Sequence, residues 1–253
     1  MNVKELYSEL SSRIPSELSE EWDNDGLMCS PDLTQSVKKA ICTLDITEEV
    51  CDYAVESGVD LIVSHHPLIF KPLSTLNEEN NIARKLMKLS SAGISVFSFH
   101  TRADKMEGGV NDILADMLGI KSALPFGEGG LGRCGYIAEP MSLEDFAYKV
   151  KTTLGTDCLK YADAYNTVSK VCVVGGDGKD FVKDAVRMGA DTYVSGRISY
   201  NMMEEAAELG INLIEAGHYF TEQPICDLFR EMLLSIDQNL YAEVVSSNLI
   251  KYI

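Results

Sequence analysis

All four histidines of this 253-residue chain stand shortly after apolar stretches that are typical of buried strands. They are His65, His66, His100 and His218. In open α/β sheets, the loops past the carboxyl ends of parallel strands form the crevice where ligands bind. Imidazole, together with carboxylate, is the ligand set of zinc, manganese, iron and nickel. The first hypothesis is therefore a metal site.

Two acidic residues extend the histidine pattern. Asp104 lies four residues past His100, and Glu222 lies four residues past His218. If the chain turns into a helix at these points, that offset brings each pair together on one helix face. A helix that begins near Thr221 would also place Glu222 in its first turn, where the helix dipole favours an anion.

His65 and His66 are adjacent, and Pro67 favours an extended conformation for His66. Adjacent extended side chains point to opposite sides, so the two imidazoles could serve two metals or flank a bridged pair. The simpler interpretation of a single histidine is a hydrogen-bonded polar residue at a strand end. That interpretation would have to hold at three strand ends together, so the clustered pattern favours a metal.

Composition excludes several classes of protein. The chain is 45% hydrophobic and 24% charged, as in ordinary soluble proteins. With 22 basic against 39 acidic residues, its net charge of −17 would repel a phosphate backbone, and we expect no nucleic-acid partner. No apolar run could cross a bilayer or act as a signal segment, so we expect no membrane contact and a cytoplasmic location. Seven cysteines without C-x-x-C spacing fit a reducing compartment, where buried thiols act as small hydrophobes.

Strand and helix patterns alternate along the chain and predict an α/β fold with parallel pairing. In the first half, strands are expected at 37–44, 59–63 and 94–99, and helices at 47–57, 80–91 and 109–118. The glycine-rich stretch 124–132 is typical of a linker. Beyond it, strands are expected at 134–138, 168–174, 191–195, 211–215 and 240–245, with helices at 143–154, 181–188, 200–209 and 221–235. The similar rhythm of the halves predicts two α/β lobes, 1–125 and 126–253.

Two further motifs have both a structural and a functional interpretation. Trp22 is followed by turn-forming residues, and we favour a packing anchor over substrate contact. The run Gly175-Gly176-Asp177-Gly178 lies between an expected strand and helix, as in phosphate-binding loops. It lacks the G-x-G-x-x-G spacing and a following Lys-Ser/Thr, so phosphate binding is the less favoured interpretation.

Together, four stretches resemble a known family. They are Trp22-Asp23-Asn24-Asp25-Gly26-Leu27, Ser64-His65-His66-Pro67-Leu68-Ile69-Phe70, His100-Thr101-Arg102-Ala103-Asp104 and Gly217-His218-Tyr219-Phe220-Thr221-Glu222. They resemble the Nif-three-like dinuclear metal centre proteins, also named GTP cyclohydrolase 1 type 2 homologues, over nearly the whole chain. The resemblance implies an α/β fold of two similar lobes, with a dinuclear metal site in the cleft to which 217–222 returns. It also implies a toroidal homohexamer.

The resemblance further implies five metal ligands and two divalent metal ions per chain. The ligands would be His65, His66, Asp104, His218 and Glu222. His66 and Asp104 would bind one ion, His65 and His218 the other, and Glu222 would bridge them. The ions could be zinc, iron, manganese or nickel, because the same donor mixture suits each of these metals.

His100 and Arg102 are the expected catalytic residues. His100 could shuttle a proton beside the metals, and Arg102 could contact a substrate phosphate. The chain departs from the family pattern at Arg197, where an acidic residue is usual, and at Asn201, where a histidine is common. If Arg197 shares a sheet edge with the histidines, its charge would help to hold an anionic substrate. The alternative is a solvated arginine or a subunit contact.

The implied activity is metal-dependent hydrolysis of a nucleotide or another phosphorylated small molecule. Two ions would lower the pKa of a shared water, and in a cyclohydrolase reaction that hydroxide would attack the imidazole carbon of a guanine nucleotide. The alternative class is a non-catalytic metal-binding, metal-delivery or regulatory protein. An open water position would favour catalysis, whereas a site closed by a further protein ligand would favour storage. A nucleotide-binding module without turnover has only the glycine run to support it.

Overall fold

The computed structural model describes residues 1–157 and 159–252, and the chain forms two compact units. Unit 1 comprises Met1–Met106 and Ile225–Leu249, and unit 2 comprises Glu107–Pro224 and Ile250–Ile253. These units differ from the expected lobes 1–125 and 126–253. The chain leaves unit 1 at residue 106, and a later helix and strand return to it because they complete its sheet and cover one face.

Unit 1 contains a five-stranded sheet with the order β1-β4-β3-β2-β11. The strands are β1 (Gly26–Cys29), β2 (Lys39–Thr43), β3 (Leu61–Ser64), β4 (Ser95–Ser98) and β11 (Tyr241–Val244). The predicted parallel pairing is confirmed for β11, β2, β3 and β4. β1 was not predicted and pairs antiparallel with β4 at the sheet margin. Neighbouring β3 and β4 therefore end at the same edge.

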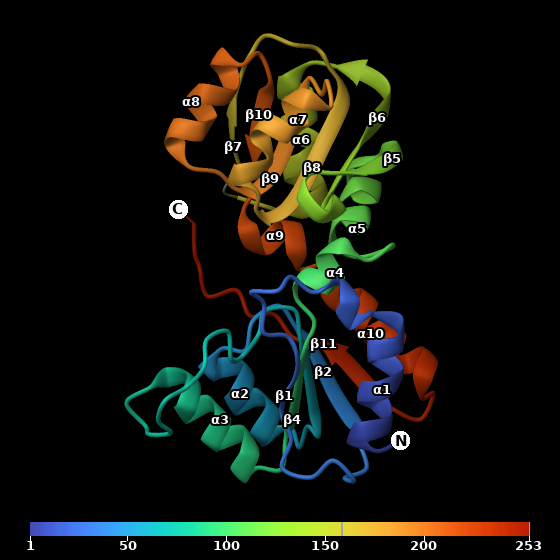
Figure 1. The fold of residues 1–253 in the computed structure, drawn as a ribbon, viewed down its shortest axis with the longest axis vertical. Helices are drawn as coiled ribbons and strands as arrows, with labels where there is room; N and C mark the ends of the chain where they lie inside the picture. Colours follow the sequence, from blue (N-terminus) through green and yellow to red (C-terminus); the bar gives the residue numbers. More distant parts are fainter. Residues whose placement is uncertain (158, 253) are drawn as a thin grey trace. The chain divides into compact units, whose positions relative to one another are not determined.

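Helices cover both faces of this sheet (Figure 1). One face carries α2 (Glu48–Glu56) and α3 (Asn81–Ser91), which pack on Ile41, Ile62 and Val96 of the strands. Thr47 and Asn80 cap these helices with their side-chain oxygens. The other face carries α1 (Val3–Arg13) and α10 (Ile225–Ile236), through ring contacts such as Phe99 with Phe229.

Unit 2 contains a six-stranded sheet with the order β5-β6-β8-β9-β10-β7. Its strands are β5 (Ile120–Phe126), β6 (Gly132–Met141), β7 (Lys160–Ala162), β8 (Val168–Asp177), β9 (Thr192–Arg197) and β10 (Asn212–Glu215). The parallel strands are β8, β9 and β10. The prediction of a linker at 124–132 is wrong. In that region β5 pairs with β6, and a 3₁₀ turn, η2 (Glu128–Gly130), joins the two strands. Sheet pairing there overrides the turn-forming composition.

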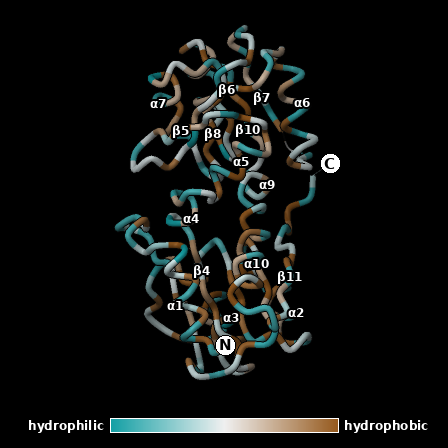
Figure 2. Tube along the Cα trace, turned by 90° about the vertical axis from the view of Figure 1, so that its right-hand side faces the viewer, coloured by the Kyte–Doolittle hydropathy of each residue, from teal (hydrophilic) through white to brown (hydrophobic). Residues whose placement is uncertain are grey.

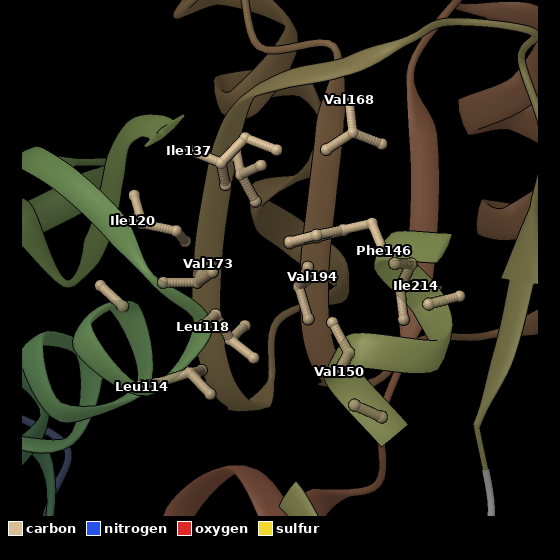
Figure 3. Close-up of a cluster of buried hydrophobic side chains, with 14 of the residues drawn as sticks. Leu114, Leu118, Ile120, Ile137, Phe146, Val150, Val168, Val173, Val194 and Ile214 are labelled. Carbon is tan, nitrogen blue, oxygen red and sulfur yellow. The ribbon is translucent and has the colours of Figure 1, made fainter. Parts of the chain in front are cut away.

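Alternating side chains of β8 divide between two cores. Val171 and Val173 pack against α5 (Val110–Leu118) and α6 (Leu143–Leu154), with Phe146 at the centre (Figure 3). Cys172 and Val174 pack on the other face, against α7 (Val182–Arg187) and α8 (Tyr200–Glu208). This two-residue period is that of a strand buried on both faces. Figure 2 shows apolar stretches of the chain within each unit, on helix α10 as well as on strands.

One pair of cysteines departs from the expectation of isolated thiols. Cys134 of β6 and Cys172 of β8 are register partners and form a disulfide. Cys42, Cys51 and Cys226 are buried, as expected of small hydrophobic thiols, and Cys158 lies outside the described residues. The two cysteines are 38 residues apart in the sequence. Their pairing depends on the register of β6 with β8, which the spacing of cysteines along the chain does not show.

In the part of the chain that the structure describes, no helix is long and apolar enough to cross a membrane. The helices α6 and α10 have 12 residues each. At 1.5 Å per residue such a helix is about 18 Å long, well short of the roughly 30 Å hydrocarbon core of a bilayer.

Candidate metal centre

Three imidazoles gather at the carboxyl edge of the sheet in unit 1. His65 and His66 follow β3, and His100 follows β4, whose last residue is in register with the last residue of β3. The ring centroids lie 5.1 Å apart for His65 and His66, and 5.3 and 5.6 Å from each of them to His100. Each ring offers one nitrogen within 4.8 Å of the others, so the trio could hold a metal ion. The predicted clustering of these residues is therefore confirmed.

Each of the three rings has its Nδ1 atom against an oxygen acceptor. The His65 Nδ1 lies 2.9 Å from the carbonyl oxygen of Phe99. The Nδ1 atoms of His66 and His100 lie 2.7 and 2.9 Å from carboxylate oxygens of Asp45 and Asp23. Carbonyl and carboxylate oxygens only accept, so Nδ1 carries the hydrogen and a neutral ring keeps its lone pair on Nε2. This is the arrangement in which proteins present imidazole to metals.

Asp104 brings a carboxylate to the same cluster. It lies on the short helix α4 (Thr101–Lys105), and its backbone N–H donates to the His100 carbonyl at 3.2 Å, so the expected helical offset is present. Its buried carboxylate oxygen Oδ1 lies 3.5 Å from Nε2 of His65. The donor set of unit 1 thus combines three imidazoles with one carboxylate.

The loop before β1 contributes Asp23, a residue that the sequence analysis did not single out. Its fully buried carboxylate accepts hydrogen bonds from His100 Nδ1, from the backbone N–H of Thr101 at 3.1 Å and from the Thr101 hydroxyl at 2.6 Å. Burial alone would raise the pKa of Asp23, but the hydrogen bonds from His100 and Thr101 lower it to about 2. Asp23 is therefore ionised and fixes the His100 ring.

Arg102 does not have the exposed position expected of a residue that contacts a substrate phosphate. Its side chain is only 2% exposed, and its guanidinium donates to Asp25 at 3.1 Å and to the carbonyl of Ile14 at 3.1 Å. The guanidinium carbon also lies 4.6 Å from the centre of the Phe99 ring. Because these groups enclose the charge, Arg102 links the loop before β1 to α4. The prediction that Arg102 contacts a substrate phosphate is therefore wrong.

Trp22 is likewise not the buried packing anchor that we favoured from the sequence. Its side chain is 62% exposed. Asp23 and Asp25 hold the loop through buried polar contacts, which leaves the neighbouring indole outside the core. The indole lies edge-on to His100, with 6.3 Å between the ring centres.

Unit 2 carries a second pair of donors on α9 (His218–Glu222). Nε2 of the half-exposed His218 lies 2.9 Å from Oε2 of the buried Glu222, as the i, i+4 spacing predicts. The helix begins at His218 rather than near Thr221, because Gly217 adopts a positive φ of 91° directly before it. Pro224 separates α9 from α10, so the single expected helix over 221–235 is two.

The glycine run at the end of β8 makes room for this pair. Gly176 has a φ of +67°, and a Cβ atom there would collide with the Glu222 carboxylate and come within 3.2 Å of Nε2 of His218. Its backbone N–H donates to the Thr221 hydroxyl at 3.1 Å. The run therefore has a packing role, since only glycine lets the strand approach α9 so closely.

Arg197 is exposed at the carboxyl end of β9. Together with Lys160 and His218, it lines a cavity of about 530 Å³ in unit 2. The expectation that it shares an edge with His218 is confirmed, whereas the shared edge with His65 and His100 is wrong, because those residues follow strands of the other sheet. Asn201, the other departure from the family pattern, is exposed on α8.

Comparison with known proteins agrees with these motifs. The model of the Duf34/NIF3 (NGG1p interacting factor 3) family matches residues 1–252. The chain belongs to the DUF34/NIF3 family. Its curated DUF34/NIF3 relatives include the GTP cyclohydrolase 1 type 2 homolog of Clostridium perfringens, which is 33% identical over 232 residues, or 89% of this chain and 88% of the relative. The homolog from Lactococcus lactis is 32% identical over 245 residues, covering 95% and 94% of the two chains.

Solved structures confirm the fold of this family. A Bacillus cereus protein related to NIF3 superposes with a TM-score of 0.89 over 100% of this chain and 99% of its own, at 23% identity. Reduced HcgD from Methanocaldococcus jannaschii superposes with a TM-score of 0.85 over 96% and 97% of the chains, at 30% identity. The resemblance seen in the sequence is thus confirmed, and the number of metal ions and the hexameric ring stay predictions.

We predict that Asp23→Asn destabilises the protein by about 1–3 kcal/mol, because a buried amide cannot replace a carboxylate with several donors around it. The folded pKa of Asp23, about 2, is below its usual value of 3.8, so the ionised group stabilises the fold above pH 3.8. That contribution is lost as the pH falls through the folded value. Urea unfolding of both proteins should show a constant stability difference above pH 3.8 that closes towards pH 2.

The control is Asp116→Asn, which changes an exposed carboxylate on α5 and should leave stability unchanged at every pH. A stability difference for Asp23→Asn that stayed the same down to the lowest pH would contradict the assignment of an ionised, hydrogen-bonded Asp23.

Proposed function

We propose that the protein binds two divalent metal ions and is a metal-dependent hydrolase of a nucleotide or another phosphorylated small molecule. The observation that carries the proposal is the set of three imidazoles whose Nδ1 atoms face oxygen acceptors, next to the buried Asp104. Structural histidines need no such common orientation. An Nδ1–H held by an oxygen acceptor leaves Nε2 available as a metal ligand, which is how proteins present imidazole to metals.

The proposed ligands are His65, His66, Asp104, His218 and Glu222. Five donors exceed the number that one tetrahedral ion needs, which favours two ions. Both sets combine imidazole with carboxylate, so zinc, iron, manganese and nickel are all suitable. The assignment of all five to one dinuclear centre follows the order of the family motifs.

When bound, two divalent ions would act as Lewis acids and supply a hydroxide nucleophile near neutral pH. His100 belongs to the same trio but is assigned to proton transfer, since its Nδ1 is fixed by ionised Asp23 and its Nε2 can exchange a proton. In a hydrolysis, the hydroxyl adds to the attacked atom and the proton goes to the leaving group. His100 would carry that proton.

A guanine nucleotide is the first substrate to test. The relatives from Clostridium perfringens and Lactococcus lactis are both named GTP cyclohydrolase 1 type 2 homologs. In a cyclohydrolase reaction, water would attack the imidazole carbon of the guanine ring and open that ring. If metal binds but no nucleotide or phosphorylated compound is turned over in a substrate screen, the metal-delivery or regulatory alternative is favoured instead.

We predict that Asp104→Asn and Glu222→Gln each lower metal affinity by at least about tenfold, since loss even of a group that only orients a ligand costs 10- to 100-fold. Both carboxylates are buried on short helices rather than on loops, so amide variants of the same size are the appropriate change. Plasma emission analysis of the purified, reconstituted proteins measures the metal retained.

Glu56→Gln is the matched control, because Glu56 is exposed on α2 and should retain full metal content. Circular dichroism should show an intact fold for all three variants. Wild-type metal content in both Asp104→Asn and Glu222→Gln would remove these carboxylates from the site.

We predict that Arg197→Ala weakens GTP binding by about 1.5–3 kcal/mol, the range for a hydrogen bond to a charged group, with metal content unchanged. Arg197 lines the cavity beside His218, where its guanidinium could hold a phosphate, whereas Lys160 in the same cavity is paired with Glu215 at 2.7 Å. Titration calorimetry on both proteins measures the difference. Arg187→Ala, which removes an exposed arginine from α7, serves as the control. Equal affinities for Arg197→Ala and the wild type would make Arg197 an ordinary surface residue.

A further inference from the structure

Two exposed aromatic side chains adjoin the imidazole cluster of unit 1. Trp22 is 62% exposed and Phe70 is 44% exposed, and their ring centres lie 6.1 Å apart. Each ring is also edge-on to His100, with centroid distances of 6.3 Å for Trp22 and 6.2 Å for Phe70. The three rings form a continuous edge-to-face group that begins in solvent and ends at the proposed site of proton transfer.

The backbone that carries this pair is held firmly. Asp23, the residue after Trp22, is fixed by its hydrogen bonds to Thr101. Asn24 donates from its side-chain amide to the carbonyl of Ile69, next to Phe70, and so joins the two loops. The exposure of these apolar rings is therefore a property of an ordered surface. A ligand that bound there would find the rings already in position, at little cost in conformational entropy.

The size of the pair favours a small ligand over a protein partner. Aromatic side chains bury about 150–250 Å² each, so two of them fall well short of the roughly 800 Å² per partner of a stable protein interface. Exposed aromatic faces instead suit a planar ring, since every nucleobase can stack on them whatever its hydrogen-bonding pattern. Their contact with His100 places that ring beside the trio of His65, His66 and His100.

We propose that Trp22 and Phe70 form a binding subsite for a planar heteroaromatic ring of the substrate, such as a purine base, beside His100. The inference deepens the proposed function by assigning the residues that would hold the base of the substrate. It rests on that function for the reaction, although binding of the ring itself requires neither turnover nor metal.

The only tryptophan of the chain lies in this subsite, so its fluorescence reports on the subsite alone. Guanosine monophosphate should quench the emission of Trp22 saturably, because a stacked purine quenches indole. Ribose 5-phosphate, which has the sugar and phosphate but no base, should leave the emission unchanged. Absence of quenching by the nucleotide, or equal quenching by both compounds, would overturn the proposal.

Variants test the two rings separately. Phe70→Leu should weaken guanosine monophosphate binding by about 5- to 150-fold, the range for loss of one base–aromatic stack. In titration calorimetry, Trp22→Ala should weaken binding to a similar extent, whereas Trp22→Phe should keep most of the affinity because it keeps a ring. Tyr148→Leu removes an exposed aromatic from α6 in unit 2 and should bind like the wild type. Wild-type affinity in both Phe70→Leu and Trp22→Ala would contradict the subsite.

Metal content and molar mass of the same samples separate this proposal from others. If the subsite is correct and the metal assignment is wrong, quenching persists in protein that binds no metal. If the metal assignment is correct and the subsite is wrong, the variants keep their metal and their nucleotide affinity. A change in molar mass for Phe70→Leu and Trp22→Ala without a change in nucleotide affinity would show that the pair serves contacts between copies, and would overturn the proposal.

Discussion

The candidate centre depends on one kind of interaction, the hydrogen bond from a histidine Nδ1 to a fixed oxygen acceptor. It occurs three times, with the Phe99 carbonyl, Asp45 and Asp23 as acceptors. Each bond determines which ring nitrogen carries the hydrogen and which way the ring turns. Without them, three adjacent imidazoles could rotate and exchange protons, and their Nε2 atoms would not be kept available as metal ligands.

These acceptors are themselves held by the fold. Neighbouring parallel strands β3 and β4 bring the histidines to one sheet edge, and the Phe99 carbonyl follows from the register of those strands. The loop that carries Asp23 is tied down by the buried pair of Arg102 and Asp25. In unit 2, Gly176 has no side chain where β8 meets α9, and this leaves space for His218 and Glu222. Residues far apart in the sequence therefore determine the geometry of a few donor atoms.

Much of this was predictable from the sequence. The apolar strands and capped helices have local patterns, and the histidines at strand ends, with acids four residues later, indicated the donors and the family. The edge strands β1, β5 and β7 were missed, because their pairing depends on tertiary contacts that their local sequences do not show. A related reason explains the wrong predictions for Arg102 and Trp22 and the failure to identify Asp23. Whether a polar or aromatic side chain is buried depends on which partner the fold brings to it, and spacing along the chain does not show the partner.

The most direct test of the account is the metal content of the wild-type protein purified without a polyhistidine tag. After reconstitution with zinc, manganese, iron or nickel and removal of loose metal, plasma emission analysis should find about two divalent ions per chain, as expected from five imidazole and carboxylate donors. Protein that retained no metal after reconstitution with any of the four would contradict the account, because the clustered imidazoles with Nδ1 held by oxygen acceptors would then have no ligand to explain them.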